Sequence, residues 1–212
     1  GIIRNIAEVD PDGPGAEVKT PSNPNDVTVL GVKKGTINDS TIDDFADGQA
    51  SRTPADDVIT KSTTQGTPVT FGVTAGGGEP IVVHNTGNVT EAFNITVNKN
   101  SLPTGSIVEL FKADGVTPLT DTNGDGVADT GPIASGATYQ VVAKVTLPSS
   151  YSSTTPISTI LTSTPVTNST GTDTINLVID KVVASTVDLH NGDATNSTGT
   201  VVGASGKDTG QF

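Results

Sequence analysis

Short runs of alternating apolar and polar residues dominate the chain between residues 66 and 182. Successive side chains of a β-strand point to opposite faces, so this period of two predicts half-buried strands. Turn-forming Gly, Pro, Asn, Asp and Ser residues separate the runs. The predicted strands are 69–73, 81–84, 93–97, 107–111, 139–147, 157–161 and 175–179. Seven short strands in this length predict an immunoglobulin-like β-sandwich.

The segments that flank the predicted sandwich carry weaker patterns. Residues 1–33 contain a few alternating positions, too few to close a sandwich, and so predict an incomplete strand module. Residues 34–65 are polar and rich in Asp, which predicts an acidic connector. Residues 183–212 hold two weak strand signals, at 183–189 and 200–202, and predict a strand-forming C-terminal extension. The predicted fold class is therefore all-β throughout.

Composition narrows the classes of protein that this chain can represent. The formal net charge is −12, and the 11 Lys and Arg residues are scattered, which argues against a nucleic-acid surface. No apolar run approaches the roughly 18–20 residues that span a bilayer, so we expect no membrane insertion. The chain has no Cys, which excludes disulfides and thiolate metal sites. Such a protein needs another means of stabilisation if it works outside the cell.

One acidic loop offers that means. The sequence Asp121-Thr-Asn-Gly-Asp-Gly-Val-Ala-Asp129 spaces oxygen-bearing side chains along a tightly turning backbone. The predicted ligands are the side chains of Asp121, Asn123, Asp125 and Asp129 and the backbone carbonyl of Val127. Calcium takes 6–8 oxygen ligands, so we expect this loop to bind a structural Ca²⁺ ion; the alternative is a solvated turn. The loop is not an EF-hand, because Pro132 stands where a bidentate Glu is required.

Other chemistry-bearing residues give weaker signals. Asn-x-Ser/Thr sequons, which are candidate glycosylation sites, occur at Asn38, Asn88, Asn94, Asn168 and Asn196. Asn94 alternates with two apolar neighbours, so we expect it to face solvent. Asp10 and Asp12 form either a second ion site or, as we favour, an ordinary turn. His84 and His190 belong to no catalytic motif, and we expect both at the surface.

Several segments together resemble the conserved-repeat Ig-like domains of bacterial surface proteins. The segment Ile2-Ile-Arg-Asn-Ile-Ala-Glu-Val9, followed by Val27-Thr-Val29, resembles the closing strands of one repeat. Val82-Val-His-Asn-Thr-Gly-Asn88, followed by Phe93-Asn-Ile95, is similar to the opening half of the next repeat. The resemblance implies a β-sandwich in an S-layer-like protein, adhesin or surface filament, without catalytic residues.

These observations favour a structural role outside the cell. We expect an extracellular subunit of a filament or S-layer-like coat whose partners are copies of itself, joined by strand exchange. The candidate intersubunit strand residues are Ile2, Ile3, Ile6, Val9, Val201 and Val202. The alternative is an adhesin or stalk module that binds a protein or glycan. An enzyme is disfavoured because no nucleophile motif or cofactor fingerprint occurs.

Overall fold

The computed structural model describes residues 2–5, 8–9, 20–21, 25–40, 57–99 and 101–185, and these contain strands but no helix. No helix that could cross a membrane therefore occurs in the described residues. Four short strands precede the sandwich: β1 (Ile2–Asn5), β2 (Glu8–Val9), β3 (Thr20–Pro21) and β4 (Asn25–Thr28). Nine build it: β5 (Gly35–Asn38), β6 (Val58–Thr64), β7 (Val69–Phe71), β8 (Ile81–Asn85), β9 (Phe93–Asn98), β10 (Ile107–Lys112), β11 (Thr138–Thr146), β12 (Ile157–Pro165) and β13 (Asp173–Val183).

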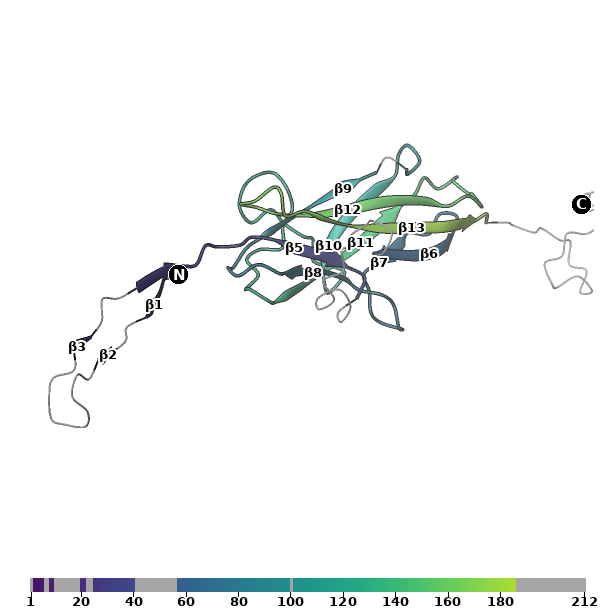
Figure 1. Cartoon of the computed structure of the whole chain (residues 1–212). Coiled ribbons are helices and arrows are strands. Elements are labelled where there is room, and N and C mark those ends of the chain that lie inside the picture. The colour runs from purple at the N-terminus through teal and green to yellow at the C-terminus, as the bar shows by residue number, and fades with distance from the viewer. Residues whose placement is uncertain are drawn as a thin grey trace, which may run out of the picture.

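Two sheets face each other in the sandwich (Figure 1). One has the strand order β10-β11-β8-β5, with β7 also paired to β11, and the other has the order β6-β13-β12-β9. All pairs are antiparallel except β6 with β13. If β5 and β6 are the two halves of strand A and β7 and β8 together are strand B, these orders are the A-B-E-D and C-F-G sheets of the immunoglobulin fold. The Ig-like all-β prediction is confirmed.

Strands β7 and β8 occupy one strand position, although the sequence suggested two separate strands. Phe71 lies opposite Ala143 and Ile81 lies opposite Val141, so both short strands pair with the same edge of β11. Residues 72–80 form an excursion between them. Gly72 begins it with a φ of 84°, and a Cβ there would lie 2.4 Å from the carbonyl oxygen of Val141. The excursion thus depends on glycine at this position.

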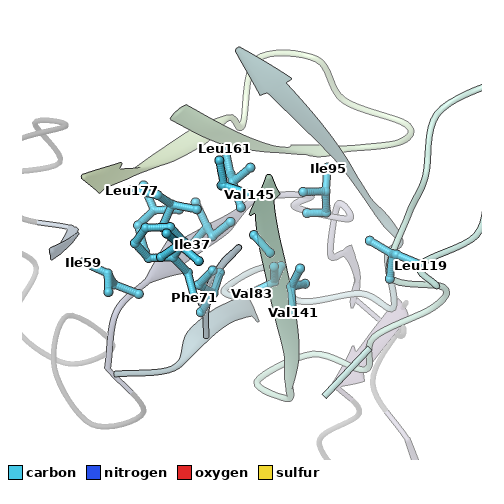
Figure 2. Packing of buried hydrophobic residues seen from close by; sticks show 14 of the residues in the cluster. Ile37, Ile59, Phe71, Val83, Ile95, Leu119, Val141, Val145, Leu161 and Leu177 are labelled. Carbon is cyan, nitrogen blue, oxygen red and sulfur yellow. The ribbon is translucent and has the colours of Figure 1, made fainter. Parts of the chain in front are cut away.

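The core lies between the sheets and receives apolar side chains from both (Figure 2). Each sheet contributes one aromatic ring, Phe71 from β7 and Phe93 from β9, and both rings are fully buried. The fully buried aliphatic side chains include Ile37, Ile59, Ile81, Val83, Val141, Leu161, Ile175 and Leu177. All of these except Ile37 and Ile59 belong to segments whose alternation predicted a strand.

The predicted boundary between connector and sandwich at residue 66 is wrong. Within residues 34–65, β5 pairs with β8 and β6 pairs with β13, so both strands belong to the sandwich. Strand β5 escaped detection because Ile37 is its one large apolar residue, although all four of its residues are buried. In β6, apolar residues stop after Ile59, and the rest of the strand is the polar sequence Thr60-Lys-Ser-Thr-Thr64. Burial here is set by the neighbouring strands, which the local pattern does not report.

The N-terminal strands form narrow ribbons that pair within their own chain. Strand β1 pairs antiparallel with β4, which places Ile2 opposite Thr28 and Ile3 opposite Val27. Strand β2 pairs with β3, which places Val9 opposite Thr20. We refer to β1–β4 as the arm, which extends beyond one end of the sandwich in Figure 1. The candidate strand residues Ile6, Val201 and Val202 lie outside the described residues.

Candidate functional site

The acidic loop lies in the long connection between β10 and β11, which crosses the edge of β9. The backbone N–H of Ile95 donates to the carbonyl of Ala128 at 2.8 Å, and that of Thr130 donates to the carbonyl of Phe93 at 3.0 Å. Glu91 and Ile133 exchange a further pair of backbone hydrogen bonds. The connection therefore covers residues 91–95 of this sheet edge and anchors the C-terminal side of the loop.

Asp121 organises the first half of the loop through backbone hydrogen bonds. Its Oδ1 accepts from the N–H groups of Asn123 at 3.2 Å and Gly124 at 2.7 Å, and its Oδ2 accepts from Gly126 at 2.7 Å. Both glycines have positive φ, 82° and 89°, as the sequence led us to expect of a tight curl. The bond from Gly126 is the main cause that lowers the pKa of Asp121 below its ordinary value.

Asp125 ties the loop to the sandwich. Its Oδ1 accepts from the N–H of Val127 at 2.9 Å, and its Oδ2 accepts from Nδ2 of Asn94 on β9 at 2.7 Å. The bond from Asn94 is the main cause that lowers the pKa of Asp125. Asn123 contributes its Oδ1 as acceptor for the N–H of Asp125 at 2.8 Å. Sequence reasoning missed Asn94 because it is 31 residues away and belongs to another element.

Asp129, the fourth predicted side-chain ligand, is buried at the base of the loop. Its side chain is only 1% exposed. It accepts from the N–H of Thr122 and that of Gly131, both at 2.6 Å, and from the hydroxyl of Thr122. Within the part of the chain that the structure describes, no three His, Cys, Asp or Glu side chains gather as metal ligands. The fold thus brings Asp121, Asn123 and Asp125 together and uses Asp129 to brace the base of the loop.

The donor set of the loop still suits a hard cation. A carboxylate has about four lone-pair sites, so Asp121 and Asp125 retain capacity beyond their hydrogen bonds. Oxygen donors alone, on an exposed loop, fit Ca²⁺ better than a transition metal. Monodentate binding by two carboxylates and one amide oxygen would supply three of the 6–8 ligands, so backbone carbonyls, such as that of Val127, and water would supply the rest.

The sequon asparagines use their side-chain amides within the fold. Asn38 is 1% exposed, and its Nδ2 donates to Oγ1 of Thr36 at 3.2 Å, so a glycan at this position is incompatible with the sandwich. Asn94 alternates with the buried Phe93 and Ile95, as predicted, but it is half-buried, because its Oδ1 atom is buried and its Nδ2 binds Asp125. Asn88 and Asn168 bind the backbone of residues 30–33. Asn196 lies outside the described residues.

His84 lies half-buried on β8, opposite Thr138 of β11 and Thr36 of β5. Partial burial lowers the pKa of its imidazole, although a hydrogen bond with the backbone of Gly136 acts in the opposite direction. Its position in the middle of a sheet, between two threonines, is that of a structural strand residue. His190 lies outside the described residues, as do Asp10 and Asp12.

No family model matches the chain, and no curated protein matches it. Among solved structures, the chain is similar to the secreted serine protease VesC from Vibrio cholerae, with 12% identity and a TM-score of 0.34; the match covers 61% of this chain and 22% of the protease. It is also similar to a PapD-like (ASH) domain of human CEP192, with 12% identity and a TM-score of 0.33, over 61% of this chain and 82% of the domain. The strand order of the molecule itself defines its Ig-like fold.

Proposed function

We propose that this chain is a non-catalytic structural subunit of an extracellular filament or coat, and that its copies join through the arm. The observation that carries this proposal is the pairing of the arm strands only with one another among the described residues. A two-stranded ribbon is at best marginally stable in water, whereas three strands with a covered apolar face are stable. A neighbouring copy supplies the missing strands.

The mode of joining is the addition of the arm, as a ribbon, to an open sheet edge. Ile2 and Ile3 already have strand partners in β4, so the outer edge of the ribbon is what remains for a neighbour. Main-chain hydrogen bonds give such β-augmentation its affinity, and side-chain pockets give its specificity. Because the donor and acceptor surfaces differ, the contact is heterologous and propagates into a fibre unless the rotation closes.

An acceptor edge of suitable form lies on β10. The second half of this strand is covered by residues 117–119, since Leu119 donates to the carbonyl of Leu110 at 2.9 Å and Lys112 donates to that of Thr117 at 2.8 Å. The first half, Ile107–Glu109, pairs with β11 on one side and with no described strand on the other. Ile107 is 54% exposed there, so an apolar side chain is available at this edge. We therefore assign this short edge as the acceptor.

Calcium binding at residues 121–127 completes the proposal. The ion would join Asp121, Asn123 and Asp125 and stiffen a loop that already covers the edge of β9. This supports an extracellular setting, where calcium is abundant and where a chain without cysteine lacks disulfides. The resemblance to surface-protein repeats supports the same location. The ion has no catalytic part in this proposal.

Electron microscopy of the whole chain with varied calcium tests the proposal. We expect ordered fibres or lattices from the intact chain, and monomers after deletion of residues 1–28. Ile107→Lys, which places a charge on the proposed acceptor edge, should also block assembly. Val116→Lys is the matched control, because Val116 is 74% exposed in the turn after β10 and lies outside the edge.

Three outcomes would contradict this assignment. A monodisperse monomer under all conditions would favour the adhesin or stalk module. Unchanged fibres after deletion of the arm would show that the joint lies elsewhere. Assembly that survives Ile107→Lys but requires the arm would reject β10 as the acceptor and leave the arm as donor.

A further inference from the structure

The segment between the arm and the sandwich lies against two loops of the sandwich. The first is the turn after β8, where Asn88 binds the segment as a neighbouring strand would. Its Oδ1 accepts from the N–H of Val32 at 2.6 Å, its Nδ2 donates to the carbonyl of Leu30 at 3.0 Å, and its own N–H donates to the carbonyl of Val32 at 3.1 Å. One residue thus satisfies three backbone groups of the segment.

The second loop joins β12 to β13 and binds the next residue of the segment. Nδ2 of Asn168 donates to the carbonyl of Lys33 at 2.7 Å. The ammonium of Lys33 lies 3.8 Å from Oε2 of Glu91, whose side chain is 4% exposed. The hydroxyl of Thr167 donates to the same carboxylate oxygen at 2.6 Å, which holds Glu91 in place. This ion pair joins the segment to residue 91, just before β9.

Close backbone approach makes both contacts sensitive to side-chain size. A Cβ at Gly87 would lie 2.2 Å from the carbonyl oxygen of Val32, and one at Gly171 would lie 3.0 Å from that of Lys33. From the opposite direction, a Cβ at Gly31 would lie 3.2 Å from Cγ1 of Val89. Backbone approach of this kind is a common reason for glycine in a loop. Glycines on both partners therefore permit the contact.

The first loop is held in shape from within the sandwich. Asn85 is fully buried, and its Nδ2 donates to the carbonyls of Val89 and Ile133, both at 2.8 Å. Its Oδ1 accepts from the N–H of Gly87 at 3.0 Å. Three hydrogen bonds from one buried amide fix the turn that presents Asn88. The binding surface therefore does not depend on the segment for its own shape.

We propose that Asn88, Glu91 and Asn168 form a clamp for extended peptide backbone, and that residues 30–34 occupy it and fix the direction of the arm. The clamp binds mainly main-chain groups, since Leu30 and Val32 remain 77% and 46% exposed. It gives Asn88 and Asn168 a structural role in place of glycan attachment. This inference deepens the proposed function, because a fixed arm sets a fixed angle between neighbouring copies.

Double electron–electron resonance on the full chain, held at a dilution below its assembly concentration so that it is monomeric, tests the clamp. The chain has no Cys, so Thr28→Cys on β4 and Thr96→Cys on β9 provide two unique spin-label sites on exposed residues. We expect a single narrow distance distribution in this background. The combined substitution of Asn88→Ala and Asn168→Ala should broaden it several-fold, and Gly87→Ala should do the same by steric exclusion. Gln140→Ala, which removes an amide on β11 that donates to the carbonyl of Gly72 at 2.7 Å, is the matched control and should leave it narrow.

A broad distribution in the labelled background, or one that stays narrow in both clamp variants, would overturn the inference. Unfolding of the sandwich is monitored in parallel, and its midpoint should change by only a few degrees in the clamp variants. Gly87→Ala retains both amide side chains, so it keeps the test decisive if the double variant folds poorly. Because the labelled protein is monomeric, a failure to form fibres would contradict the proposed function without affecting this result.

Discussion

The sandwich and the arm both contain strand-forming segments, yet among the described residues only the sandwich closes over a core. In the sandwich, strands far apart in the chain bring Phe71, Phe93 and Leu177 to one buried interior. In the arm, each described strand has a single partner and pairs at short range. Alternation of apolar and polar residues alone therefore does not make an independently stable unit. The described strands of the arm pair only with one another, and this is why we propose that another copy completes them.

The largest expected effect separates the two regions by their contribution to stability. Phe71→Ala should lower the free energy of unfolding by about 3–5 kcal/mol, because it removes a fully buried ring and leaves a cavity. Deletion of residues 1–28 should change the unfolding midpoint of the sandwich very little. Denaturant unfolding followed by circular dichroism measures both. A large loss on deletion of the arm would show that the arm packs on the sandwich of its own chain.

Calcium should act on the sandwich through the acidic loop and leave the arm unaffected. By mass action, an ion present at 100 times its Kd would stabilise the folded chain by about 2.7 kcal/mol. Calorimetry should therefore show a midpoint that rises with added calcium. Asp125→Ala should abolish this rise, whereas Asp114→Ala, outside residues 121–129, should preserve it. An unchanged midpoint in the intact chain at millimolar calcium would exclude a structural ion here.

A smaller effect concerns the excursion that divides one strand position into β7 and β8. Gly72→Ala should destabilise the sandwich by about 1–3 kcal/mol, because the residue has positive φ and its Cβ would meet the carbonyl oxygen of Val141. Gly76→Ala is the informative control, since it also has positive φ but nothing lies within 4 Å of its Cβ. Thermal unfolding of both variants separates strain from steric overlap. Equal losses of stability in the two variants would show that the positive φ alone causes the destabilisation.

The smallest expected effect is a pH dependence of stability that arises from the acidic loop. The folded state lowers the pKa of Asp121 and Asp125 below the ordinary 3.8. Lowered values mean that their contribution to stability is complete above about pH 3.8 and is lost as the pH falls through the folded-state values. Combined Asp121→Asn and Asp125→Asn should remove part of the difference in unfolding midpoint between pH 5 and pH 2. Identical pH profiles of the variant and the intact chain would contradict this linkage.

Much of the sandwich could be predicted because the alternation of apolar and polar residues within a strand indicates which of its side chains are buried. The segment 139–147 predicted β11, and 175–179 lies within β13. Strand β5 could not be predicted, because Thr36 and Asn38 are buried by strands whose positions the local sequence does not report. The acidic loop is recognisable from residue spacing alone, but the hydrogen bonds of Asp129 and the contact from Asn94 follow from the path of the connection along β9.

The sequence by itself determined the all-β class, the acidic character, the absence of disulfides and the location of the oxygen-rich loop. Each of these depends on composition or on spacing within a few residues. Only the tertiary structure decided that residues 35–38 and 58–64 complete the sandwich, that the first strands pair with one another, and that Asn88 and Asn168 bind the linking segment. These are contacts between residues up to 135 positions apart, and such contacts leave no local periodicity in a sequence.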